Sequence, residues 1–299
     1  MQSGMYFARN VLWLGNQTEG TGCSPKYILP GAIKWKEQDG GRKHSARAKN
    51  ERNKVEIKLT GTGPIWSRYQ SASALINGNI MIDMPNGIFK SLMTEDNSRD
   101  KIDHVILTHM HGDHILGLPV WALRKTKTVP PPQEGSIRIC VSHGQKDTLE
   151  SIVRNSFSTS LTEEKTGRYF RWIGEDEFTL PGLKIRRIPV KHGSLPDCSG
   201  YLVTDGCVTV GFTGDSCICD GVREIVSSAD LVFCDCDLIT GDQKHMGIND
   251  LRSLVKEYPG VKIVAAHLKD ETRSELSRLK PEGITAAADG EIIRVSRKT

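Results

Sequence analysis

The sequence predicts an α/β protein in which two sheets stack face to face between outer helices, a four-layer αββα sandwich. The chain has 299 residues, of which 37% are hydrophobic and 25% charged, as is typical of a globular protein with a sizeable core. Short apolar segments alternate with helical segments in both halves of the chain. Residue types that bind metals end five predicted strands, at positions 109, 192, 215, 236–237 and 267. Two halves that each contribute such residues from one sheet edge predict the sandwich.

The first 54 residues differ in composition from the rest, so we expect an N-terminal extension at 1–54 and a main domain at 55–299. Residues 26–36 are interpreted as a short hairpin around Pro30-Gly31. Residues 34–54 hold eight Lys or Arg and three Asp or Glu. A block of this kind is typical of a solvated arm, and an arm that grips phosphates is the alternative interpretation.

The first half of the main domain begins with an alternating strand at 55–59 and a glycine-rich turn, Thr60-Gly61-Thr62-Gly63-Pro64. Asn77-Gly78-Asn79 predicts a hairpin between strands at 71–76 and 80–84. Apolar periodicity then predicts, in order, a helix at 88–93, a strand at 103–109, a helix at 115–125, a strand at 137–141 and a helix at 146–156.

The second half repeats this alternation of strands and helices. Its elements are predicted as strands at 184–190, 200–204, 207–212 and 231–236, a helix at 248–257, a strand at 261–265, a helix at 268–279 and a closing strand at 292–295.

Three histidines and an aspartate cluster in the motif His109-Met110-His111-Gly112-Asp113-His114, between a predicted strand and a helix. His109 and His111 share a face of the extended segment because side chains alternate there, and Asp113 and His114 turn back at the helix start. Imidazole and carboxylate ligands suit zinc, manganese or iron. A solvated, His-rich turn is the alternative, and the spacing favours a pair of catalytic metals.

The order of this motif, His192, Asp215 and His267 resembles the metallo-β-lactamase superfamily over residues 55–297. The resemblance implies the αββα fold and two divalent metal ions, with Zn²⁺ expected and Mn²⁺ or Fe²⁺ as alternatives. It implies that the first metal is held by His109, His111 and His192. It implies that the second metal is held by Asp113, His114 and His267, and that Asp215 bridges the two.

Such a pair of cations, roughly 3.5–4 Å apart, can share a water and lower its pKa towards neutrality. The resulting two-metal-bound hydroxide is the expected nucleophile. Asp113 is then the expected proton acceptor during its attack.

Two features resemble the phosphodiesterase branch of the superfamily, which includes tRNase Z and the phosphoribosyl cyclic phosphodiesterases. One is the carboxylate at Asp215. The other is His245, which lies 22 residues before His267. In that branch the extra histidine binds a phosphoryl oxygen or protonates the leaving group, and imidazolium is the usual donor near neutral pH. We therefore expect Asp113 and His245 to be catalytic; a loop histidine at a helix start is the alternative for His245.

Three features of the sequence differ from tRNase Z or from the phosphoribosyl cyclic phosphodiesterases. Met246 and Gly247 stand where tRNase Z carries Ser or Thr, and the 22 residues at 193–214 leave no room for its long RNA-gripping arm. The segment after the first turn, Trp66-Ser67-Arg68-Tyr69-Gln70, lacks the cysteine cluster frequent in the phosphoribosyl enzymes. For Arg68 and Tyr69, contact with a phosphate or base and surface packing are equal alternatives.

The expected function is therefore metal-dependent hydrolysis of a phosphodiester bond in a small or cyclic nucleotide-like substrate. The alternatives are a tRNase Z-like ribonuclease that grips RNA through residues 34–54, a hydrolase of another ester, lactam or thioester, and a non-catalytic metal-stabilised binding protein.

Charge and cysteine content agree with this expectation without specifying it. The net charge of +4 and pI of about 8.6 are compatible with an anionic substrate and give no evidence of nucleic-acid binding. The pairs Cys217/Cys219 and Cys234/Cys236 are interpreted as small, reduced, buried thiols on strands.

Residues 5–15 are too short and too interrupted for a signal peptide or a membrane span, so a cytoplasmic location without membrane partners is expected. A homodimer is expected from the family resemblance alone.

Overall fold

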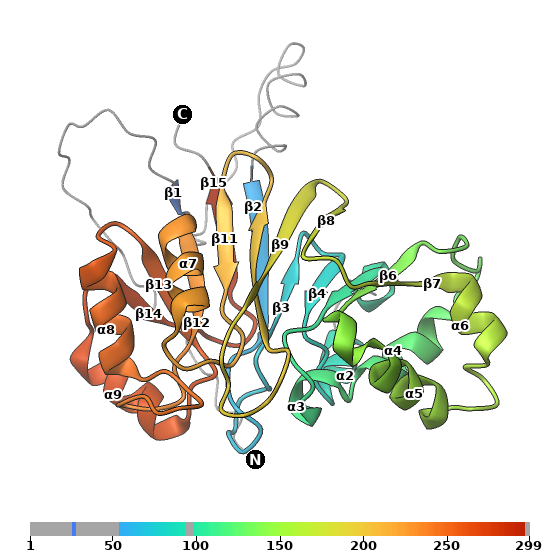
Figure 1. The fold of residues 1–299 in the computed structure, drawn as a ribbon, viewed down its shortest axis with the longest axis horizontal. Helices are drawn as coiled ribbons and strands as arrows, with labels where there is room; N and C mark the ends of the chain where they lie inside the picture. The colour runs from blue at the N-terminus through green and yellow to red at the C-terminus, as the bar shows by residue number, and fades with distance from the viewer. Residues whose placement is uncertain (1–25, 28–53, 94–97, 297–299) are drawn as a thin grey trace, which may run out of the picture.

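The computed structural model describes residues 26–27, 54–93 and 98–296. It contains two mixed sheets packed face to face, with helices on both outer surfaces (Figure 1). All of the arm at 34–54 except Lys54, and most of the hairpin at 26–36, lie outside the described residues. The boundary between residues 54 and 55 stays a prediction.

The first sheet has the strand order β1-β15-β2-β3-β4-β5-β6-β7. Pairing is antiparallel from β1 to β4 and parallel from β4 to β7. Its strands are β1 (Lys26–Tyr27), β15 (Ile292–Ser296), β2 (Lys54–Gly61), β3 (Ser73–Ile76), β4 (Ile80–Ile82), β5 (His104–Ile106), β6 (Ile137–Cys140) and β7 (Phe170–Ile173).

The second sheet repeats this plan with the order β14-β13-β12-β11-β10-β9-β8. Pairing is parallel from β14 to β11 and antiparallel from β11 to β8. Its strands are β8 (Glu177–Leu180), β9 (Leu183–Pro189), β10 (Ser199–Thr204), β11 (Thr209–Phe212), β12 (Leu231–Asp235), β13 (Lys262–Ala266) and β14 (Ile284–Ala286).

The helices form the two outer layers. Figure 1 shows the helices of the first half, in green, on one side of the sheets and α7, α8 and α9, in orange and red, on the other. Their bounds are α2 (Ile88–Met93), α3 (Gly112–Ile115), α4 (Leu118–Lys125), α5 (Lys146–Ser156), α6 (Glu163–Tyr169), α7 (Asp220–Ser228), α8 (Ile248–Glu257) and α9 (Asp270–Leu279). Two short 3₁₀ segments are η1 (Ser98–Lys101) and η2 (His143–Gln145).

Three apolar clusters fill the spaces between these layers. The central cluster joins the sheets and includes Ile57, Ile76 and Phe233. A second lies under the first-half helices around Trp121, and a third lies under α7 to α9 around Leu251. The central strands β4 and β12 are buried along their whole length, as expected for strands covered on both faces. The predicted αββα sandwich is confirmed.

The structure corrects the helix predicted at 115–125. The chain makes a short helix, α3, and then a second helix, α4, with a break at Leu116-Gly117. A Cβ at Gly117 would lie 2.2 Å from the Pro85 carbonyl oxygen, so the backbone turns where only glycine fits. This break ends α3, which carries Asp113 and His114 of the motif, and leaves α4 packed on the sheet.

Several short elements of the structure are not predicted from the sequence: α6, β7, β8, α7 and β14. A signal for α7 was present, because Val222, Ile225 and Val226 follow a helical period and are buried. The strand β8 offers only four residues, of which Leu180 alone is fully buried, and such a segment has no distinctive period.

In the ranges that the structure describes, every helix is too short or too polar to cross a bilayer.

Tyr201 links the two sheets beside the metal-binding motif. It lies on β10, is fully buried, and donates a hydrogen bond of 2.7 Å to the Leu107 carbonyl at the exit of β5. Tyr201→Phe leaves that carbonyl buried without its donor. We expect a loss of about 1–3 kcal/mol in the free energy of unfolding, measured by urea denaturation. Tyr258→Phe is the control, because it removes a hydroxyl from a ring that is only partly buried beside the third cluster. It should leave the midpoint nearly unchanged, and equal midpoints for both variants would contradict the prediction.

Candidate metal centre

Chain segments that follow four strands bring the predicted site residues to one edge of the sandwich. His109 and His111 follow β5, His192 follows β9, Asp215 follows β11 and His267 follows β13. The carboxyl ends of parallel strands open at the same edge of a sheet, which is where α/β proteins bind ligands. Asp113 and His114 lie on α3, and His245 lies just before α8.

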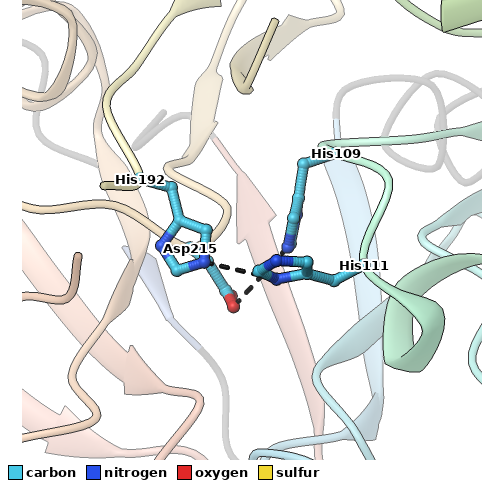
Figure 2. Close-up of side chains that lie close together, drawn as sticks. All are labelled: His109, His111, His192 and Asp215. Atoms are coloured by element: carbon cyan, nitrogen blue, oxygen red, sulfur yellow. Dashed lines mark hydrogen bonds and ion pairs between the residues drawn. The ribbon is translucent and has the colours of Figure 1, made fainter. Parts of the chain in front are cut away.

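All seven predicted ligands and His245 come together in three overlapping groups. Within each group, one potential ligand atom from every residue lies within 4.8 Å of the others. The groups are His109, His111, His192 and Asp215; Asp113, His114 and His267; and Asp215, His245 and His267. Figure 2 shows the first group, with residues from both halves of the fold pointing towards one another. His111 is exposed while His109 and His114 are buried, so the cluster is open to solvent on the His111 side.

Each of three buried imidazoles is held by a hydrogen bond at its Nδ1 atom. His114 Nδ1 is 2.8 Å from Asp83 Oδ2, and His192 Nδ1 is 2.9 Å from the Lys244 carbonyl oxygen. His109 Nδ1 is 3.0 Å from the hydroxyl of Thr108, which gives its own proton to Asp83 and therefore accepts from the imidazole. These partners place the proton on Nδ1 in each ring. The Nε2 lone pairs are then directed at the cluster.

The Nε2 atoms of His109 and His114 are buried and have no hydrogen-bond partner among the described residues. His192 Nε2 lies 3.3 Å from His111 Nδ1, so these two imidazoles meet inside the cluster. Buried nitrogens without hydrogen-bond partners are costly in an otherwise empty site. A set of imidazole and carboxylate donors with free lone pairs fits divalent metal ions such as Zn²⁺.

Asp215 occupies the centre of the cluster. Its Oδ2 lies 3.2 Å from His267 Nε2, 3.4 Å from His114 Nε2 and 3.8 Å from His109 Nε2. One carboxylate oxygen thus faces His109 of the first group and His114 and His267 of the second, which is the arrangement expected of a bridging ligand.

The charges around Asp215 shift the pKa values of the imidazoles in opposite directions. Burial and the neighbouring His114 hold the pKa of His109 well below its ordinary value. Burial also disfavours charged His267, but Asp215 and Asp235 outweigh it and raise its pKa to about 9. Asp215 and Asp83 likewise outweigh burial at His114 and raise its pKa. Protons therefore compete with a metal for His114 and His267.

Asp83 is a site residue that the sequence analysis missed. Its carboxylate accepts from the Thr108 backbone N–H, the Thr108 hydroxyl and His114 Nδ1, all at 2.8 Å. Its backbone is left-handed, with φ of 56°, where Asp is tolerated better than most residues. No local pattern distinguishes an aspartate that follows a strand by one residue, so its role emerges only from the partners it contacts.

Asp235 is the second missed residue. Its Oδ2 accepts from the Ser216 backbone N–H at 2.9 Å and lies 2.9 Å from His245 Nδ1, while its Oδ1 is 3.5 Å from His267 Nδ1. The sequence analysis instead selected positions 236–237 at this strand end. Asp237 forms an ion pair of 2.6 Å with Lys269 and stands behind His267, at 3.8 Å.

The cysteine interpretation is correct for one pair and wrong for the other. Cys234 lies on β12, and Cys236 directly follows it; both are buried, as expected. Cys217 and Cys219 are half-buried in the segment between β11 and α7, because the chain leaves β11 at Phe212 to place Asp215. Within the described residues the cysteines are free thiols.

An αββα sandwich whose strand ends gather imidazoles and carboxylates in this way defines the class of metallo-β-lactamase-fold hydrolases. The model of the β-lactamase superfamily domain matches residues 79–268, a range that includes every predicted ligand and His245. The chain belongs to this superfamily.

Two curated relatives match most of the chain. The anti-Pycsar protein Apyc1 of Bacillus phage 010DV004 is 25% identical over 269 residues, which cover 78% of this chain and 98% of that protein. Ribonuclease Z of Macrococcus caseolyticus is 21% identical over 271 residues, which cover 71% of this chain and 85% of that protein.

Two solved structures show the same fold. A diphosphatase from the PhnP family superposes with a TM-score of 0.63 at 20% identity, covering 80% of this chain and 96% of its own. The metallo-β-lactamase-fold protein YhfI from Bacillus subtilis superposes with a TM-score of 0.66 at 19% identity, covering 81% of this chain and all of its own. The fold and the family predicted from the order of motifs are confirmed.

Asp83→Asn tests whether Asp83 orients His114 for metal binding. Asparagine tolerates the left-handed backbone, so the change removes the negative charge without adding strain. We expect Zn²⁺ affinity to fall roughly 10- to 100-fold at one of two sites, measured by chelator competition. Asp100→Asn, which breaks an ion pair with Arg124 away from the cluster, is the matched control. Unchanged Zn²⁺ affinity in Asp83→Asn would show that Asp83 has a structural role only.

Proposed function

We propose that this protein is a binuclear metal-dependent phosphodiesterase that acts on a small or cyclic nucleotide-like substrate. His109, His111 and His192 would hold one divalent cation, and Asp113, His114 and His267 the other. Asp215 would be shared between them. Two bound cations such as Zn²⁺ would supply an activated water and neutralise charge on the phosphoryl oxygens.

The position of His245 is the observation that carries this proposal. Its ring stacks on His267 with centroids 5.1 Å apart and meets the ring of His192 edge-on at 4.6 Å. Its Nδ1 lies 2.9 Å from Asp235, which leaves Nε2 as the nitrogen for a substrate oxygen. A hydrogen-bonded imidazole that is only half-buried beside the ligand cluster is suited to give a proton to a leaving alkoxide.

The remaining steps use residues of the same cluster. Asp113 is partly exposed and its Oδ2 lies 3.7 Å from His114 Nε2, so its other oxygen is available to accept a proton from the attacking water. His245 protonates the oxygen that departs from phosphorus. Asp235 holds the His245 ring in place and stabilises its charged form.

The named relatives support phosphate chemistry without identifying a substrate. They include ribonuclease Z from several organisms, a PhnP-family diphosphatase and the short form of human tRNase Z. Yeast PDE1 also shares the fold.

A ribonuclease is the second candidate, because several relatives bear that name. Residues 193–214 argue against an enzyme that grips the body of a tRNA. They form the β10–β11 hairpin and its flanks within the second sheet, and no long arm is inserted there. A steep salt dependence of RNA affinity would favour the ribonuclease instead. The homodimer and the cytoplasmic location stay predictions.

Hydrolysis of bis(p-nitrophenyl) phosphate by the metal-loaded protein is the direct test. We expect turnover that a chelator abolishes and that His245→Ala lowers by roughly 10²-fold or more, because general acid catalysis contributes at least that much. The control is His143→Ala, which removes an exposed histidine on η2. Turnover that survives in His245→Ala at the control's level would contradict the proposed role, and a metal-loaded protein without turnover would point to another bond type.

The pH profile tests the proton donor separately. Burial lowers the pKa of His245, but its hydrogen bond and proximity to Asp235 outweigh burial, so the net pKa is raised. A proton donor works below its pKa, so kcat/KM should fall as pH rises through that value. Asp235→Asn removes the raising charge and should move this alkaline limb to lower pH. In Asp237→Asn, the control, the limb should stay in place; identical limbs in all three proteins would exclude His245 as the donor.

A further inference from the structure

The loop between β2 and β3 presents a tryptophan to solvent, on a segment bonded to the chain next to His267. Trp66 is 92% exposed and its neighbour Ile65 is 53% exposed. Figure 1 shows the loop that joins β2 to β3 reaching beyond the sheets at the edge where α3 begins. A single exposed apolar residue is ordinary on a protein surface. A binding role for Trp66 therefore depends on how firmly its loop is held and on where the loop lies.

The loop is fixed to itself by short backbone hydrogen bonds. Thr62 and Gly63 both donate to the Gln70 carbonyl at 2.9 Å, and Ser67 donates to the Pro64 carbonyl at 3.1 Å. A Cβ at Gly61 would lie 2.0 Å from the Ser71 carbonyl oxygen, so the returning chain itself requires glycine there. Trp66 therefore sits on a tight, internally bonded turn.

The loop is also tied to the segment that carries His267. The Leu268 N–H donates to the Thr62 carbonyl at 2.9 Å, directly after His267. From α9, Arg273 donates to the Thr62 hydroxyl at 2.9 Å and lies over the Tyr69 ring, 3.9 Å from its centroid. Arg68 lies 3.5 Å from Asp270 of the same helix. The exposed indole is thus positioned relative to a residue of the metal cluster.

Distance limits what this indole can touch. Trp66 lies four positions after Thr62, so their Cα atoms lie at most about 14 Å apart. The tight turn shortens this span, and the indole ring extends from it. A nucleotide whose phosphate lies at the metal centre extends its sugar and base over a comparable length.

The chemistry of the exposed side chain indicates which kind of ligand would contact it. Indole offers a flat, apolar face for stacking on a base. The adjacent Arg68 pairs with Asp270 and helps to hold the loop. Ile65 and Trp66 alone are far too few for a protein interface, which needs roughly 800 Å² from each partner.

We propose that Trp66 is a specificity residue, whose indole stacks on the nucleobase of the substrate while the phosphate is held at the metal centre. This inference rests on the proposed function and assigns its substrate class, a phosphodiester that carries a nucleobase. The contact confers preference for nucleotides and takes no part in bond cleavage.

The test compares two product-like ligands on the metal-loaded full chain by isothermal titration calorimetry. Adenosine 5′-monophosphate and ribose 5-phosphate carry the same phosphate and differ in the base. We expect the nucleotide to bind about tenfold tighter or better, since stacking of one base on an aromatic side chain contributes at least that factor. Trp66→Ala should reduce the ratio to about one, and Trp66→Phe should retain most of it.

The matched control is Val129→Ala, which trims a residue that is 94% exposed on the α4–β6 loop and should leave the ratio unchanged. An unaltered ratio in Trp66→Ala would overturn the inference. So would a change of sedimentation state in Trp66→Ala with the ratio preserved, because a second copy of the chain would then be the occupant. Hydrolysis of bis(p-nitrophenyl) phosphate is measured on each variant: turnover without nucleotide preference refutes the role of Trp66 alone, whereas loss of both refutes the proposed function as well.

Discussion

Buried carboxylates that need positive partners are the constraint on which this structure depends. Asp215 and Asp235 lie inside the protein with imidazoles around them, and Asp237 has the ammonium of Lys269. A buried charge is tolerated only when it is paired and hydrogen-bonded. The carboxyl ends of strands from both sheets supply these partners. The face-to-face packing of the two halves therefore also assembles the cluster.

The fold and the ligand set were accessible from sequence because each depends on local patterns. Apolar periodicity identifies α5 and α8 to the residue, and the order of His109, His192 and His267 along the chain indicates the cluster. Asp83 and Asp235 were not accessible, because their partners lie far away in sequence or have no characteristic spacing. The break at Gly117 was missed for the same reason: it depends on contact with the Pro85 carbonyl.

The sequence predicts a glycine-rich turn after β2, and the structure shows why glycine stands at positions 61 and 63. In the structure, a Cβ at either position would meet the loop's own residues, Ser71 or Ser67. The glycines thus make the loop tight, and this tightness fixes the exposed indole of Trp66 in space.

Protons and metal ions compete for the same nitrogens, which explains how the cluster can be stable in the fold and still bind cations. Without a cation, protonated His267 and His114 compensate Asp215, as their raised pKa values indicate. Once protonated, an imidazole nitrogen offers no lone pair. Occupancy must therefore displace those protons, and His109, whose pKa is held low, is free to coordinate first. The buried carboxylate of Asp215 can therefore be compensated either by protonated imidazoles or by cations.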